Sequence, residues 1–203
     1  YMESSELGRV YEPDLAIVAS MESFSAAARV MEPVTDAEWI EWMRQAHQDY
    51  LDNLHPSLDM SGVDMHEVMN VLNEKLPDDA IITNDAGNFS GWAQRFYRYR
   101  KFRTQLAPTS GAMGYGIPAA ISARLVRPDR PVVCFVGDGG AMMSGQEVAT
   151  AVQYGSDPII LVINNNSYGT IRMHQERDYP DRTLATNLVN PDFAKWAESF
   201  GGY

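Results

Sequence analysis

The chain of 203 residues has a single cysteine, few basic residues and no long apolar run. With only Cys134, no disulfide framework can form, which favours a reducing cytoplasm. Its place in an apolar stretch favours a core residue over a reactive thiol. Sixteen Lys and Arg against 27 Asp and Glu give a formal net charge of −11, so a nucleic-acid or anionic-membrane partner is not expected. No signal peptide is present, and no apolar run reaches the roughly 18 residues of a membrane span.

The most informative stretch lies in the second half of the chain. Two β-branched runs, Val132–Val136 and Ile159–Ile163, are bounded by turn residues and are typical of buried parallel strands. Between them, Ser144 and Glu147 form a capping box that predicts the start of a helix, which Gly155 can close. This β-α-β crossover brings the carboxyl ends of both strands to one edge of the sheet, where α/β sheets bind ligands.

Glycines, one carboxylate and several amides follow the two strands at this edge. The first strand runs into Gly137-Asp138-Gly139-Gly140 and the second into Asn164-Asn165-Asn166. Glycines let backbone N–H groups approach an anion, and Asp138 would repel that anion unless a cation lay between them. Mg²⁺ fits because it is usually held by one or two carboxylates plus substrate phosphates. With Asn165 and the Ser167 carbonyl as further oxygen ligands, the residues predict a Mg²⁺-diphosphate site; ordinary turns after strands are the alternative.

The pair GDG at 137–139 and NN at 164–165 resembles the signature of thiamine-diphosphate (ThDP) enzymes. The resemblance implies that Asp138, Asn165 and the Ser167 carbonyl are the Mg²⁺ ligands. It also implies that Gly139 and Gly140 contact the diphosphate and that Gly137 belongs to the same cofactor-binding turn. The implied architecture is the ThDP-binding fold: an α/β, three-layer parallel sheet with helices on both faces, incomplete at the C-terminus.

Two further segments match ThDP-binding stretches of this family. The loop after a predicted strand at 80–83 contains Gly87 and Asn88, which match diphosphate contacts; an ordinary loop entering a helix is the alternative. The segment 111–120 resembles the aminopyrimidine-binding stretch. The resemblance implies that the Gly111 carbonyl accepts from the 4′-amino group and that Met113 supports the bent cofactor. Tight helix–sheet packing is the alternative there.

The helix expected after residue 168 borders the substrate in ThDP enzymes. The pyruvate-decarboxylase-like branch has a catalytic Glu six residues after the second Asn, where this chain has Ile171. That difference argues against the proton relay of that branch. His174 is either a substrate-side acid or base or a surface residue. The Glu that activates the cofactor comes in this family from a pyrimidine-binding domain of a partner subunit, which this chain lacks. The catalytic residue therefore stays unassigned, and the chain alone is expected to be inactive.

The sequence of the N-terminal part gives fewer indications of structure and function. Residues 1–33 hold a predicted strand at Leu15–Ala19 and a short helix, and they resemble the end of the middle domain of acetohydroxyacid-synthase-like enzymes. Residues 34–60 predict a connecting helix, opened by a capping box at 35–38, and a linker. Residues 61–203 are expected to be a truncated diphosphate-binding domain. In this domain Asp64, with Glu67 three residues later, predicts the start of a helix, and the segment 190–194 predicts the start of a last helix that runs to Phe200. Both ends look cut, so we expect a fragment of a larger polypeptide.

The resemblance implies an acetolactate-synthase-like carboligase that decarboxylates a small 2-oxo acid, as a homodimer or homotetramer. A 2-oxo-acid decarboxylase or C–C lyase of the same superfamily is the enzymatic alternative. From a different class, the chain could be a non-catalytic diphosphate- or nucleotide-binding module or an interaction module. Asn165 and the Met113 segment distinguish these, because a general phosphate binder needs the glycine turn but neither of them.

Overall fold

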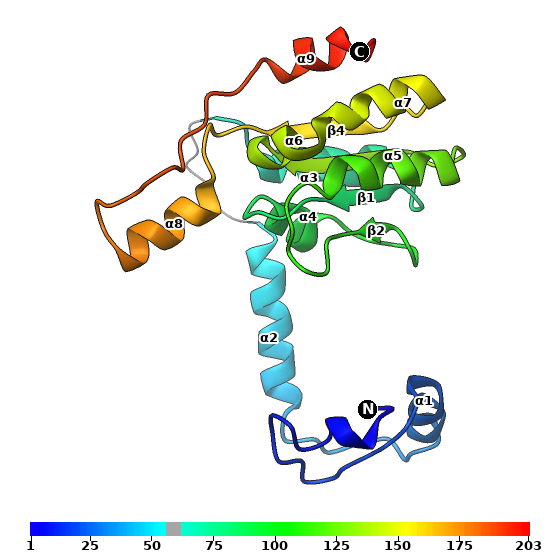
Figure 1. Ribbon diagram of the computed structural model, residues 1–203. Helices are drawn as coiled ribbons and strands as arrows, with labels where there is room; N and C mark the ends of the chain where they lie inside the picture. Colours follow the sequence, from blue (N-terminus) through cyan, green and yellow to red (C-terminus); the bar gives the residue numbers. More distant parts are fainter. Residues whose placement is uncertain (56–61) are drawn as a thin grey trace. The chain divides into compact units, whose positions relative to one another are not determined.

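The computed structural model describes residues 1–55 and 62–203 (Figure 1). The chain divides into two compact units, residues 1–57 and 58–203, and the second unit carries the sheet. The last residues of the predicted linker, 56–60, lie outside the described part of the chain.

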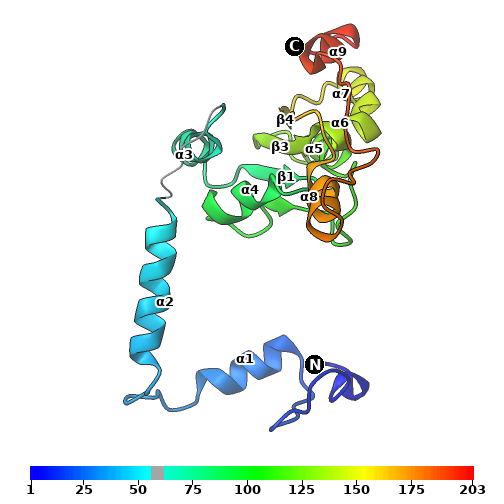
Figure 2. The ribbon, with the colours of Figure 1, turned by 90° about the vertical axis from the view of Figure 1, so that its left-hand side faces the viewer.

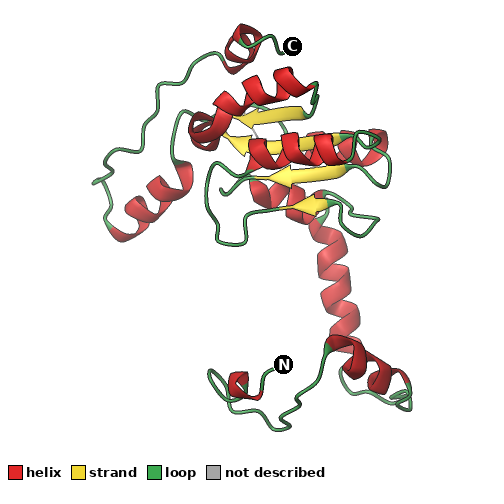
Figure 3. Ribbon diagram, turned by 45° about the vertical axis from the view of Figure 1, so that its right-hand side comes forward, coloured by secondary structure: helices red, strands yellow, loops and turns green. Residues whose placement is uncertain are grey.

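Parallel strands form the centre of the second unit. In its described residues the sheet has four strands in the order β2-β1-β3-β4 (Figure 3). These are β1 (Ile81–Asn84), β2 (Gln105–Leu106), β3 (Val132–Gly137) and β4 (Ile159–Ile163). β3 lies between β1 and β4, and Val132 to Val136 are all buried. This burial explains why β3 is a continuous apolar run. The three strands predicted in this unit are confirmed, but the burial expected for the run at 159–163 is wrong, because β4 lies at the edge of the described sheet and its residues are half-buried or exposed.

Helices cover both faces of the sheet (Figure 2). One face carries α5 (Gly116–Val126), α6 (Asp138–Ser144) and α7 (Val148–Tyr154), and the other carries α3 (Met65–Lys75) and α4 (Ser90–Phe96). Alternate side chains of β3 enter the two layers, as strand geometry requires. Val132, Cys134 and Val136 pack on the α5 side, and Val133 and Phe135 pack on the α3 side. The predicted three-layer α/β architecture is confirmed.

Two helix boundaries predicted from sequence are correct. Asp64 caps α3, where its carboxylate accepts from the N–H groups of His66 at 2.8 Å and Glu67 at 3.3 Å. Gly155 ends α7 in the left-handed region with φ of 65°. Glycine is favoured there because a Cβ is strained at positive φ.

The side-chain caps predicted at Ser144 and at Thr35 do not form. Ser144 makes no capping hydrogen bond, because the helical stretch already begins at Asp138 and continues through the 3₁₀ segment η2 (Gly145–Glu147) into α7. The box at 35–38 fails because the Thr35 hydroxyl donates to Asp36 at 3.4 Å instead of capping a helix. The helix α2 (Ile40–Asn53) then begins without a side-chain cap.

Within residues 1–55, the first unit has no buried core. It contains η1 (Ser4–Glu6), α1 (Met21–Arg29) and α2, and none of residues 1–55 is buried. The predicted strand at Leu15–Ala19 is wrong, because this extended segment has no strand beside it within residues 1–55, and an unpaired strand is not stable. No helix in the described part of the chain is both long and apolar enough to cross a membrane.

Two helices follow β4 in the second unit. α8 (Gly169–Asp178) begins shortly after the three asparagines, and α9 (Phe193–Ser199) comes near the end of the chain. Asp192 caps α9 by accepting the Lys195 N–H at 3.2 Å. Phe193 packs against the buried cluster on the α5 side of the sheet. The helix predicted near the end of the chain is therefore confirmed.

Two glycines provide a matched stability prediction. Gly155→Ala is expected to lower the free energy of unfolding by about 1 kcal/mol, because alanine is strained at this left-handed position. Gly91→Ala in α4 is expected to raise it by about 0.4–1 kcal/mol, through the lower entropy of the unfolded chain. A Cβ on Gly91 would meet nothing within 4 Å. Urea denaturation of both variants measures the difference, and changes of the same sign would contradict it.

Candidate functional site

A cavity of about 830 Å³ lies at the carboxyl edge of the sheet, within the second unit. Segments that follow β1, β3 and β4 line it, together with the loop before α5. Two residues singled out from the sequence do not line it: Gly140 is buried, and His174 is exposed on α8. The others all line the cavity: Gly87, Asn88, Gly111, Met113, Gly137, Asp138, Gly139, Asn165, Ser167 and Ile171. The crossover thus brings together residues that lie far apart in the sequence.

Asp138 is the carboxylate that connects the two strand ends. It is 3% exposed, and its Oδ1 accepts from the Gly139 N–H at 2.9 Å. Its Oδ2 accepts from the Ser167 N–H at 3.2 Å and from the Asn190 amide at 2.7 Å. The same Ser167 N–H donates to Asn165 Oδ1 at 3.1 Å. Hydrogen bonds from the Ser167 N–H therefore connect the three residues that are expected to bind a metal.

The oxygens of this cluster suit a hard cation. They are one carboxylate, one amide oxygen and one backbone carbonyl, which are the ligand types that Mg²⁺ accepts. Within residues 1–55 and 62–203, no three His, Cys, Asp or Glu side chains group so as to hold a metal ion. The Ser167 carbonyl accepts from the Gly169 N–H at 2.8 Å, and a carbonyl has a second lone pair with which to coordinate a cation. The residues present therefore fit Mg²⁺.

Aromatic rings lie against three glycines of the cavity. A Cβ on Gly137 would lie 2.9 Å from Phe89 Cε1, and one on Gly87 would lie 2.5 Å from the same atom. A Cβ on Gly139 would collide with the ring of Tyr168. Close packing against these rings therefore already requires glycine at the three positions. Sequence reasoning named the glycines but missed both rings, because nothing local marks their partners.

Asn190 is a second residue that sequence reasoning missed. Its amide reaches Asp138, and it also donates to Asn164 Oδ1 at 2.9 Å and Asn166 Oδ1 at 3.3 Å. It thereby holds the asparagine loop against the turn after β3. The only sequence signal here was the start of α9, which gave no reason to connect Asn190 with a carboxylate 52 residues earlier.

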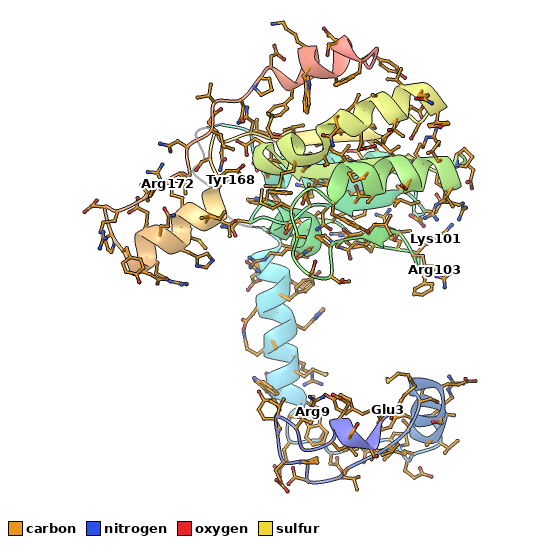
Figure 4. All side chains as sticks on the ribbon, in the orientation of Figure 1. Glu3, Arg9, Lys101, Arg103, Tyr168 and Arg172 are labelled. Carbon is orange, nitrogen blue, oxygen red and sulfur yellow. The ribbon has the colours of Figure 1, made fainter. Side chains whose placement is uncertain are left out.

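The start of α8 contacts the loop after β1. The Asn88 N–H donates to Thr170 Oγ1 at 3.2 Å, and the Asn88 side chain donates to the Met173 sulfur at 3.6 Å. Figure 4 shows Tyr168 and Arg172 at this end of α8. Ile171 supplies an apolar part of the cavity wall. Of the two substrate-side candidates, only Ile171 is therefore placed at the cavity.

Cys134 takes no part in this site. It is fully buried in β3, and burial raises the pKa of its thiol to about 12. A thiol with so high a pKa stays protonated and is a poor nucleophile. The interpretation of Cys134 as a core residue is confirmed.

Known proteins resemble most of this chain. It is 31% identical over 204 residues to an acetolactate synthase large subunit of Lactococcus lactis, covering 98% of this chain and 35% of that subunit. It is also 31% identical to the acetolactate synthase isozyme 1 large subunit of Escherichia coli, covering 98% of this chain and 36% of that one. The chain therefore spans about a third of the length of these relatives.

A solved structure and a family model agree with these relatives. The ThDP-dependent 4-hydroxybenzoylformate decarboxylase of Rhodococcus jostii matches with a TM-score of 0.67 and 28% identity, covering 72% of this chain and 28% of that one. Residues 85–203 match the model described as thiamine pyrophosphate enzyme, C-terminal TPP binding domain. That range includes every cavity residue from Asp85 onward. The chain thus belongs to the thiamine pyrophosphate enzyme family and carries its C-terminal, TPP-binding domain.

Proposed function

We propose that this chain provides the Mg²⁺-ThDP site of an acetolactate-synthase-like carboligase that decarboxylates a small 2-oxo acid. The convergence of Asp138, Asn165 and Ser167 at one cavity carries the proposal. The Asp138 carboxylate, Asn165 Oδ1 and the Ser167 carbonyl would hold Mg²⁺. Asn190 supports the set by orienting the carboxylate through its 2.7 Å hydrogen bond.

The remaining cavity residues would bind and orient the cofactor. Gly87, Asn88 and the turn at 137–139 would contact the diphosphate, and the Gly111 carbonyl would accept from the aminopyrimidine. Met113 is near enough to support the bent cofactor, since a Cβ on Gly139 would lie 3.1 Å from Met113 Cε. When bound, ThDP supplies the electron sink for loss of CO₂ and formation of a carbon–carbon bond.

Ile171 favours the carboligase over the decarboxylase. Its apolar side chain lines the cavity and has no proton to transfer. The decarboxylase remains a second candidate because the solved relative from Rhodococcus jostii is named as one. Product analysis after incubating pyruvate with the enzyme that carries this chain separates the two. A carboligase gives acetolactate, whereas a simple decarboxylase gives acetaldehyde.

Two further proposals concern the setting of the enzyme. Homo-oligomerisation follows from the family expectation that a partner subunit supplies the activating Glu. A reducing compartment such as the cytoplasm suits a chain whose single cysteine is buried and cannot form an accessible disulfide. A sedimentation experiment on the enzyme tests the first proposal, since a monomer would overturn it.

Calorimetric titration tests the cofactor assignment against a general diphosphate-binding module. We expect ThDP to bind only with Mg²⁺ present, and to bind more tightly than inorganic pyrophosphate, because the Gly111 and Met113 segment adds contacts to the organic part. ADP with Mg²⁺ serves as the matched control. ADP that binds as tightly as ThDP would instead support the non-catalytic nucleotide-binding module.

A further inference from the structure

Asp85 is a buried carboxylate for which the proposed function gives no role. It follows β1, is 0% exposed and lines the cavity. Its Oδ1 accepts from the N–H groups of Ala86 at 2.7 Å and Gly114 at 3.0 Å. Its Oδ2 accepts from Gly114 at 2.9 Å and Gly116 at 3.3 Å. Within residues 1–55 and 62–203, no cation pairs with Asp85.

In the described structure, backbone N–H groups therefore donate all the hydrogen bonds that this buried carboxylate accepts. A buried carboxylate is unfavourable unless hydrogen bonds satisfy its oxygens. Two of the three donors, Gly114 and Gly116, belong to the segment that leads into α5, and Gly116 is the first residue of that helix. The helix dipole favours a negative charge at this end. Asp85 thus fixes the loop that carries Gly111 and Met113 to the end of β1.

The same carboxylate also contacts the glycine turn after β3. A Cβ on Gly140 would lie 2.8 Å from Asp85 Oδ2 and 3.2 Å from Val136 Cγ2. Gly140 therefore has no room for a side chain because Asp85 occupies the space beside it. Sequence reasoning had assigned Gly140 to the diphosphate. In the structure, Gly140 is the residue that lets Asp85 reach between the 111–116 loop and the turn.

We propose that Asp85 is a positioning residue that sets the aminopyrimidine-binding loop relative to the diphosphate-binding turn. The inference rests on the proposed function, since it assigns those two roles to the segments that Asp85 connects. A merely structural anchor would weaken all ligands alike when removed. Removing a positioning residue would instead weaken the contacts to the thiamine part of the cofactor and leave those to the diphosphate unchanged.

Asp85→Asn is the decisive variant, because it keeps the side-chain shape but turns an NH₂ group toward backbone donors. Losing one or two such hydrogen bonds should weaken Mg²⁺-ThDP binding by about tenfold or more. Binding of Mg²⁺-pyrophosphate should stay nearly unchanged in calorimetry. In the cofactor-free protein, hydrogen exchange at Gly114 and Gly116 should accelerate by about tenfold. Asp78→Asn is the matched control, because that carboxylate is exposed and pairs with Arg100.

Gly140→Ala is a second variant that leaves the charge of Asp85 in place. Its new Cβ would displace the carboxylate and should reproduce the selective loss of ThDP affinity. Equal losses for ThDP and pyrophosphate in both variants, or unchanged exchange at Gly114, would overturn the positioning role. A wild-type protein that binds neither ligand would instead overturn the proposed function. Exchange in the variants would then still decide whether Asp85 anchors the loop.

Discussion

Asp138→Ala is expected to weaken Mg²⁺-dependent ThDP binding by about 100-fold or more. The change removes the only carboxylate among the three proposed metal ligands. It also removes one hydrogen bond each from the Ser167 N–H and the Asn190 amide, which keep only their bonds to asparagine oxygens. Unfolding free energy should therefore fall by about 1–3 kcal/mol as well. Calorimetry and urea denaturation measure the two effects separately.

Two control variants separate the loss of charge from the loss of structure. Asp138→Asn keeps one oxygen acceptor and the side-chain shape, so we expect it to retain more stability than Asp138→Ala while still losing metal affinity. Asp129→Ala removes a carboxylate that is more than half exposed and pairs with Arg127, so it should change neither quantity much. Mg²⁺-dependent binding of normal strength in Asp138→Ala would contradict the proposed ligand set.

Phe135→Ala is expected to cause the largest loss of stability, about 3–5 kcal/mol. Phe135 is fully buried in β3, in the cluster on the α3 side of the sheet. Removing the ring loses the favourable free energy of burying it. It also leaves an unfavourable cavity in the cluster that contains Met69 and Ile82. Because Asp138 follows β3 directly, the same variant should also weaken cofactor binding.

Phe102→Ala is the matched control for this loss. Phe102 is 88% exposed, and the guanidinium of Arg103 lies over its ring at 5.3 Å. Substitution at such a surface position usually changes stability by less than about 0.5 kcal/mol. Chemical denaturation of the two variants should therefore differ by several kcal/mol. Similar values for both would mean that the α3-side cluster is not a main source of stability.

Local patterns were sufficient to predict the central elements. The continuous apolar run of β3 predicted a strand buried on both faces, and Asp64 predicted the start of α3 through its side-chain cap. The convergence of Asp138 with Asn165 followed from the crossover rule, which places both strand ends on one edge. These features depend on neighbouring residues or on the general right-handedness of β-α-β crossovers, so a single sequence is enough to predict them.

Features that depend on distant partners were missed. The Asn190 hydrogen bond to Asp138 and the packing of Phe89 on Gly137 join segments with no local relation. Ser144 carried a capping signal that failed because a helix already preceded it. The strand expected at Leu15–Ala19 failed because pairing needs a neighbour, which an apolar run does not provide by itself.

The most direct test of the account is the position of the metal in a crystal of the protein with ThDP and Mn²⁺ in place of Mg²⁺. Anomalous scattering locates the ion independently of any assumed ligands. We predict one peak bounded by the Asp138 carboxylate, Asn165 Oδ1 and the Ser167 carbonyl, with the diphosphate on its open side. A bound cofactor whose metal lies away from Asp138 would contradict the account.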